Sequence, residues 1–373
     1  MNTEKIKKIE ESLVRIKNKE NKFLFFIPDS EAPTASVYEV FFHAYTMKKA
    51  GYKVICITEG DNYELPTWIE SELLDQDFLS ITKANKLTVS PDDVMVIPDV
   101  FTNVMEQVKQ MNCIKIGLLQ SMDYMVNGLI PGTSFAVLGI QNVITTSKTL
   151  KEHFEMFYGE KVYDVQTYKI GIPDYFGKSE VPQKPIISII GRSSNDISKI
   201  VKLFYSRFPQ YNWISFDAMY TDSKPPQHLG RVEFAKRLQG NFAAIWVDRL
   251  ASFGTFPLEC MKSGVVPICL KPDITPEYLL VRDENGAVVD VNSECGVWTN
   301  SLYDIPVLTG EVITKFLDDS IKPEFYDVMD NVVAPYNPTN AAAELVGIYD
   351  HFITKKVEMY NELVEVLNKK ENE

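Results

Sequence analysis

The feature that most constrains the fold is a repeated alternation of short apolar runs with amphipathic helical segments. Residues 22–28 (KFLFFIP) and 52–58 (YKVICIT) are apolar runs of strand length, and a segment with helical character, 37–49, lies between them. Further runs of this kind lie at 94–99, 115–120, 142–147 and 162–169. Strands that are apolar throughout and separated by helices predict a parallel sheet that is covered by helices.

The alternation is interrupted once and then starts again. Residues 171–185 (GIPDYFGKSEVPQKP) combine Gly, Pro and charged residues without periodicity, as an interdomain linker does. At 373 residues the chain also exceeds the size at which a single core usually keeps growing. We therefore expect an α/β protein with two Rossmann-like domains. The expected bounds are 1–175 and 176–340, with a C-terminal helix in 341–373 that packs back on the first domain.

Charge and cysteine content narrow the classes of function. Lys and Arg number 38 against 51 Asp and Glu, a net charge of −13, which disfavours general nucleic-acid binding. The five cysteines are scattered and form no CxxC pair, and none of the four histidines has metal-ligand spacing. The charged first twenty residues are no secretory signal, and no run reaches the roughly 18–20 apolar residues of a membrane span. These features predict a cytoplasmic protein that binds no metal.

The clearest signal for a site lies in residues 248–268 (DRLASFGTFPLECMKSGVVPI). A strand leads into a Ser-Phe-Gly-Thr turn, and a helix is expected to start near Phe256 and Pro257. Gly254 allows a ligand to approach the backbone closely, and the free N–H groups of a helix start suit a phosphate. Glu259, in the first turns of that helix, can accept hydrogen bonds from the two hydroxyls of a ribose.

This segment resembles the retaining GT-B enzymes of glycosyltransferase family four. Their motif is Glu-x-Phe-Gly, then a second Glu, Ala-Met and Gly-x-Pro, and one bacterial branch reads SFGTFPLEAM. This chain has Phe253, Gly254, Glu259, Met261 and Gly264 in register, and Pro267 one residue later than the motif places it. Weaker matches follow in the order of the family at 144–154, 171–176, 189–192, 228–238 and 283–289. The similarity as a whole extends over most of residues 22–310. One departure is Ala251, which stands where the family has the first Glu, a contact to the donor sugar; Asp248 and Ser252 are the candidate substitutes.

The resemblance implies a GT-B fold, with two domains facing across a cleft, and a metal-independent hexosyl- or pentosyltransferase that needs no cofactor. The second domain would bind a nucleoside diphosphate sugar, with UDP as the expected carrier, and the first domain the acceptor. Arg192 and Lys199 are expected at the diphosphate, where they would also act in catalysis. The remaining expected donor contacts are Gly230, Arg231 and Val232 at the base, Arg249, Ser252, Phe253, Gly254 and Thr255 around the phosphates and sugar, and Glu259 at the ribose.

In the first domain, loops that follow strands are expected to face the acceptor. They supply Ser36, Gln120 and Tyr124 as acceptor contacts and Asp123 as a candidate catalytic group. A simpler interpretation stands beside several of these assignments. Asp123 is a loop aspartate that caps its own turn, Lys199 a solvated helix lysine, and Arg249 a plain surface charge.

Three functions remain open at this point. The first is transfer to a cell-envelope or lipid-linked glycan. The second is modification of DNA that carries hydroxymethylated bases, as some phage GT-B enzymes perform. The third, suggested by Ala251, is a catalytically inactive module that binds a nucleotide sugar or a glycan.

Overall fold

The chain divides into two units, each built on a parallel sheet. Unit 1 comprises Met1–Tyr168 and Ala342–Glu373, and unit 2 comprises Lys169–Ala341. The computed structural model describes residues 2–29, 33–159, 161–178, 184–220, 229–251, 253–285, 288–291, 295–318 and 323–372. The predicted α/β class with two parallel sheets is confirmed.

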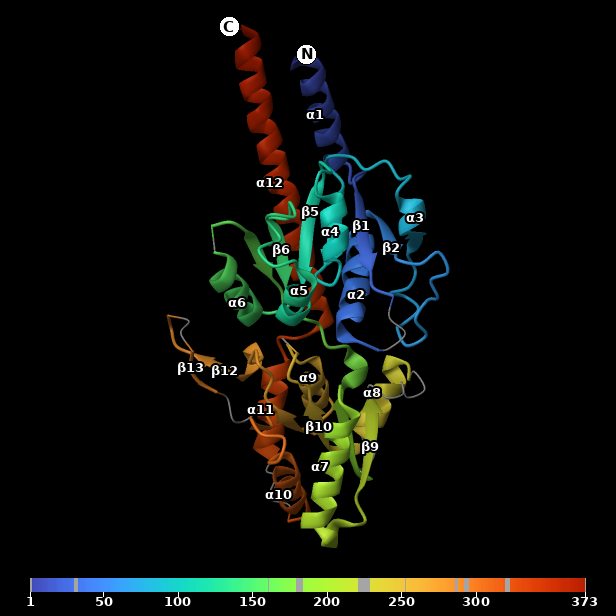
Figure 1. Ribbon diagram of the computed structural model, residues 1–373, viewed down its shortest axis with the longest axis vertical. Coiled ribbons are helices and arrows are strands. Elements are labelled where there is room, and N and C mark those ends of the chain that lie inside the picture. Colours follow the sequence, from blue (N-terminus) through green and yellow to red (C-terminus); the bar gives the residue numbers. More distant parts are fainter. Residues whose placement is uncertain are drawn as a thin grey trace. The chain divides into compact units, whose positions relative to one another are not determined.

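In the described part of unit 1, seven parallel strands form one sheet in the order β3-β2-β1-β4-β5-β6-β7 (Figure 1). The strands are β1 (Lys22–Ile27), β2 (Lys53–Thr58), β3 (Asp77–Ser80), β4 (Val94–Pro98), β5 (Ile114–Leu119), β6 (Asn142–Thr145) and β7 (Asp164–Thr167). Along the chain, β2 and β3 are added on one side of β1, and β4 to β7 are then added one after another on its other side. The switch point of the sheet, where open α/β sheets bind ligands, therefore lies between β1 and β4.

The helices of unit 1 connect its strands or lie before and after them in the chain. They are α1 (Asn2–Lys17), α2 (Ala35–Lys49), α3 (Ile81–Ala84), α4 (Thr102–Val108), α5 (Met122–Gly128) and α6 (Lys148–Tyr158), together with most of α12 (Pro338–Asn372). Tyr349 joins α12 to the rest of the unit: its hydroxyl lies 2.8 Å from His43 Nδ1 on α2, and its ring meets Phe23 of β1 edge-on at 5.3 Å. The C-terminal helix thus packs on unit 1.

In unit 2, the described residues form a second parallel sheet of five strands, in the order β14-β11-β10-β8-β9. The strands are β8 (Lys184–Gly191), β9 (Ser215–Tyr220), β10 (Asn241–Val247), β11 (Val266–Leu270) and β14 (Val297–Thr299). Its helices are α7 (Ser194–Arg207), α8 (Arg231–Gln239), α9 (Thr255–Lys262), α10 (Ile305–Leu317) and α11 (Pro323–Val333), with short turns η1 (Asp174–Phe176), η2 (Pro209–Tyr211) and η3 (Glu277–Leu279). The switch point of this sheet lies between β8 and β10.

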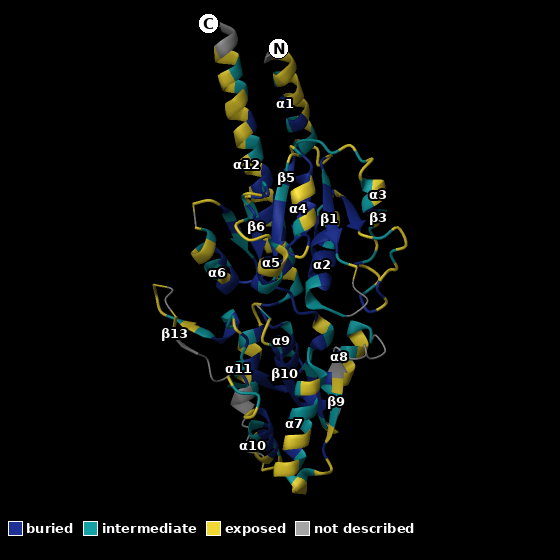
Figure 2. Ribbon diagram, in the orientation of Figure 1, coloured by how far each residue is buried: buried dark blue, intermediate teal, exposed yellow. Residues whose placement is uncertain are grey.

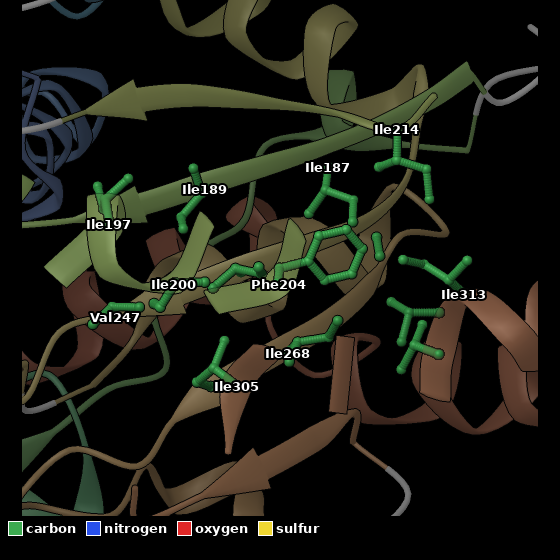
Figure 3. Packing of buried hydrophobic residues seen from close by; sticks show 14 of the residues in the cluster. Ile187, Ile189, Ile197, Ile200, Phe204, Ile214, Val247, Ile268, Ile305 and Ile313 are labelled. Carbon is green, nitrogen blue, oxygen red and sulfur yellow. The ribbon is translucent and has the colours of Figure 1, made fainter. Parts of the chain in front are cut away.

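The core of unit 2 forms where α7 and α10 cover the sheet. Phe204 of α7 is fully buried, and its ring lies among the side chains of β8 and β11 and of α10 (Figure 3). β-branched residues dominate this cluster, as expected for strands that are buried on both faces. The labelled members are Ile187, Ile189, Ile197, Ile200, Phe204, Ile214, Val247, Ile268, Ile305 and Ile313. Figure 2 shows the central strands of both sheets mostly as buried and the outer faces of the helices as exposed.

Three details differ from the sequence-based expectations. Unit 1 ends at Tyr168 rather than at residue 175, because the following segment bonds within unit 2: Ile172 N donates to Tyr336 O at 2.8 Å. Asp77 begins a short strand, β3, that is not among the apolar runs of the sequence. An antiparallel hairpin, β12 (Leu280–Arg282) with β13 (Val288–Val291), was not expected at all.

Two further expectations concern the thiols and the membrane. All five cysteines are unpaired, in agreement with the absence of any CxxC pair, and all five are buried. Among the described helices, none combines the length and the apolar character that a membrane crossing requires.

Candidate functional site

The predicted donor residues gather at one edge of the unit 2 sheet. Arg192 follows β8, Arg231 opens the helix that comes after β9, and the turn with Gly254 follows β10. These three strands are parallel neighbours, so their carboxyl ends meet at the same edge, on both sides of the switch point. The expectation that Ser252 contributes to this turn falls on a residue outside the described ranges.

The turn before α9 depends on glycine at position 254. Gly254 is the N-cap of α9 and has φ +77°, a conformation that costs any other residue energy. A Cβ at this position would lie 2.7 Å from Cη2 of Trp246. The Tyr278 hydroxyl donates to Gly254 O at 2.8 Å and fixes the turn from behind. The first N–H groups of α9, beginning with Thr255, therefore start from a rigid bend and can serve as anion donors.

Glu259 and Arg231 form a buried ion pair, which the sequence motif did not predict. Arg231 Nη2 donates to Glu259 Oε1 at 2.7 Å, and the two side chains are only 11% and 6% exposed. Burial raises the pKa of the Glu259 carboxyl, and the Arg231 charge acts in the opposite direction. Arg231 Nε also donates to the Tyr175 hydroxyl at 3.2 Å, and its guanidinium lies 5.5 Å from the centre of the Phe176 ring.

The flanking residues of the turn differ in what they offer to a ligand. Phe253 is buried, with its ring edge-on to those of Tyr278 at 6.0 Å and Tyr336 at 5.8 Å, so its side chain supports the turn from the core of the unit. Gly230 is the N-cap of α8, and Val232 in the first turn of that helix is exposed. Only the backbone of Phe253 can meet a ligand, which the motif alone could not reveal.

The two cations expected at the diphosphate each pair with a carboxylate. Arg192 Nε donates to both carboxylate oxygens of Asp248, at 2.9 Å each. Lys199 pairs with Asp196 on its own helix, α7, at 3.2 Å. Asp248 is thus engaged by Arg192 at the switch point, while Arg249 beside it is exposed. The Arg192 side chain is 43% exposed, so a ligand can reach it.

In unit 1, the structure brings two of the expected acceptor residues together. Gln120 Nε2 donates to the backbone oxygen of Ser36, in the first turn of α2, at 2.9 Å. Asp123 and Tyr124 follow in the first turn of α5, where both are half-buried. Ser36, Gln120 and their neighbours therefore share the carboxyl edge of this sheet, next to its switch point.

Asp99 is a candidate at this edge that the sequence interpretation missed. It directly follows β4 and is fully buried, and its Oδ2 accepts from the backbone N–H groups of Gln120 at 2.8 Å and Ser121 at 2.7 Å. Burial raises its pKa to about 7, and its hydrogen bonds with backbone N–H groups lower it in part. A signal was present in the sequence, because an aspartate immediately after a buried strand at the switch point lies where α/β proteins bind ligands.

The charged groups of the two sheet edges form no cluster of metal ligands in the described parts of the chain. Among the described residues, no three His, Cys, Asp or Glu side chains gather as metal ligands would.

Known proteins resemble this chain in structure but not detectably in sequence. No family model and no curated protein sequence matches it. HepE of Anabaena, solved with UDP-glucose, matches with a TM-score of 0.59 and 11% identity, over 88% of this chain and 99% of that one. The pneumococcal O-GlcNAc transferase GtfA, solved with UDP and GlcNAc, matches with a TM-score of 0.54 and 8% identity, over 92% and 99%.

A third similar structure was solved with DNA. It is an α-glucosyltransferase in complex with UDP and a DNA that contains a HMU base, with a TM-score of 0.54 and 10% identity over 89% of this chain and 99% of that one. At these identities the likeness establishes the fold, which is the GT-B fold of two Rossmann-like units.

Proposed function

We propose that this chain is a glycosyltransferase that takes a sugar from a nucleoside diphosphate sugar bound at unit 2. The observation that carries the proposal is the edge where a glycine-dependent turn, the start of α9 and a buried carboxylate meet at the switch point of a parallel sheet. The GT-B fold, shared with enzymes solved with UDP or UDP-glucose, supports the same assignment and suggests UDP as the carrier.

Each group has a role that follows from its chemistry. The first amides of α9 donate to the phosphates, helped by the positive end of the helix dipole. Glu259 accepts hydrogen bonds from the ribose hydroxyls. Arg192, which a diphosphate can share with Asp248, stabilises the negative charge that grows on the leaving diphosphate as the glycosidic bond breaks. Lys199 adds a second positive charge, and these two cations take the part that a metal ion has in other transferases.

The finer features of the proposal come from the sequence resemblance. They are membership of family four, retention at the anomeric carbon, transfer of a hexose or pentose, absence of any cofactor, and acceptor binding by Ser36, Gln120 and Tyr124 in unit 1. For the acceptor we propose a cell-envelope or lipid-linked glycan, met on the cytoplasmic side. Because Ala251 replaces the family's first Glu, which contacts the donor sugar, we expect this chain to recognise the sugar in a different way.

A thermal-shift screen against UDP-, GDP- and ADP-sugars tests this proposal, with UMP as the control that lacks the second phosphate. A ligand at about 100 times its Kd should stabilise the native chain by about 2.7 kcal/mol. We expect one sugar nucleotide to raise the Tm clearly and UMP to raise it much less. If no sugar nucleotide changes the Tm, the proposal is wrong.

The same samples distinguish an enzyme from a binding module. Slow release of the nucleoside diphosphate from the preferred sugar nucleotide, with water as acceptor, identifies an enzyme. Binding without any release identifies the inactive module that Ala251 suggests. If label from that donor is transferred to duplex DNA with hydroxymethylated bases, and not to lipid-linked glycans, the acceptor is DNA and the proposed glycan acceptor is wrong.

A further inference from the structure

The Arg231 side chain is held by three neighbouring side chains. Its guanidinium bonds Glu259 and the Tyr175 hydroxyl and lies over the Phe176 ring. The turn that carries these aromatic residues, η1, is itself tied to α8, because Gln239 Nε2 donates to Tyr175 O at 2.8 Å. These contacts fix both the position and the orientation of the guanidinium.

This arrangement acts on Glu259 in two ways. First, burial favours the neutral form of the carboxyl, and the nearby guanidinium favours the ionised form. Second, the 2.7 Å hydrogen bond to Oε1 sets the direction in which the carboxylate points. Hydrogen bonds to an ionised carboxylate are roughly twice as strong as those to a neutral group. Both effects of Arg231 favour a carboxylate that is charged and has a fixed direction, which is the form that accepts a hydrogen bond most strongly.

We propose that Arg231 is the positioning residue that makes the nucleotide site select ribose over 2′-deoxyribose. The inference rests on the proposed function, in which Glu259 touches the ribose. Arg231 acts through Glu259, by holding an ionised and oriented oxygen where the 2′-hydroxyl donates. A 2′-deoxyribose brings no such donor, and the buried carboxylate then loses a hydrogen bond that it had in water.

Calorimetric titration of the full chain with UDP and with 2′-deoxy-UDP tests this role. One hydrogen bond to a charged group is worth about ten- to hundredfold in Kd, so the wild-type chain should bind UDP at least about tenfold more tightly. In Arg231→Met the ratio of the two Kd values should fall to about threefold or less. Arg231→Lys keeps the charge but not the fork of donors, and its ratio should lie between these values.

Arg237→Met is the matched control. Arg237 lies on the same helix and also pairs with an aspartate, Asp217, at 2.6 Å, but that pair is on the surface. This variant should keep the wild-type ratio. Circular dichroism establishes that each variant is folded, and if Arg231→Met is not, the lysine variant alone decides, because its ratio must still fall.

The outcomes separate this inference from the function on which it rests. An unchanged ratio in the folded Arg231 variants overturns the inference, and so does an equal loss of affinity for both nucleotides, which would mean a purely structural role. A wild-type chain that binds the two nucleotides equally also overturns it, but leaves the proposed function standing. A wild-type chain that binds neither overturns the inference together with UDP as the carrier, and the thermal-shift screen against GDP- and ADP-sugars then decides on the proposed function.

Discussion

Replacing Gly254 by alanine should destabilise unit 2 by an amount that the structure allows us to work out. The left-handed backbone at φ +77° costs a residue with a Cβ about 1–2 kcal/mol. The new Cβ would also lie 2.7 Å from Trp246 Cη2 and 2.9 Å from the Tyr278 hydroxyl, and overpacking of this kind costs about 1–3 kcal/mol. The sum is a loss of about 2–5 kcal/mol in the free energy of unfolding.

Two other glycines separate the contributions. Gly264 also has a positive φ, +70°, but a Cβ there would meet Lys178 Cγ at 3.3 Å, a flexible side chain that can move away. Gly264→Ala should therefore cost only the backbone part, about 1–2 kcal/mol. Gly240 has φ −78° and room for a Cβ, so Gly240→Ala should be neutral or stabilising by up to about 1 kcal/mol.

Urea denaturation followed by tryptophan fluorescence measures this series. Three of the four tryptophans, Trp213, Trp246 and Trp298, lie in unit 2, so the signal reports mainly on that unit. We expect the order of stability Gly240→Ala, then Gly264→Ala, then Gly254→Ala. Equal losses at positions 254 and 264 would refute the reasoning, because they would mean that the turn before α9 is not packed closely against Trp246.

Three further predictions concern charged and titratable groups. Glu259→Gln should cost about 3–5 kcal/mol in the free energy of unfolding, because the buried Arg231 cannot lose its proton. Asp217→Asn, at the surface pair with Arg237, should cost less than about 1 kcal/mol. Urea midpoints compare the two variants, and equal losses would contradict a desolvated Arg231–Glu259 pair. Burial lowers the pKa of His43 to about 3, so the unfolded chain takes up the proton first as the pH falls. Below about pH 6.5 the wild-type chain should then lose about 1.4 kcal/mol of stability per pH unit relative to His43→Gln. Urea denaturation of both chains at pH 7, 6 and 5 measures this difference. If the stabilities of the two chains change in parallel with pH, the imidazole is not buried as a neutral group. Arg192→Ala should weaken the binding of UDP about tenfold and that of UMP hardly at all, because Arg192 is assigned to the diphosphate. Calorimetric titration measures both Kd values. Similar losses for the two nucleotides would mean that Arg192 does not contact the second phosphate.

The sequence predicted those parts of the fold that have strong periodicity. The apolar runs at 22–28 and 52–58 correspond to β1 and β2, because a strand that is buried on both faces must be apolar throughout. Short or polar elements carry no such pattern. β3 reads DFLS and β12 reads LVR, and their pairing depends on neighbours distant in the chain, so periodicity could not reveal them.

The candidate site was predictable in its position but not in its contacts. The motif located Gly254 and Glu259, because their spacing from the preceding strand follows from local geometry. It could not reveal that Arg231, 28 residues earlier, pairs with Glu259, or that the Phe253 ring is buried, because both depend on how separate segments pack. The place of Asp99 directly after a strand was visible in the sequence, but its hydrogen bonds with the amides of Gln120 and Ser121 were not, because those residues belong to another loop.

The most direct test of the central claim is a crystal structure of the full chain with UDP. The account predicts the diphosphate at about 3 Å from the first amides of α9 and the ribose hydroxyls on the Glu259 carboxylate, with Arg231 still paired to it. A nucleotide that is well ordered at any other place, with this edge of unit 2 occupied only by solvent, would contradict it.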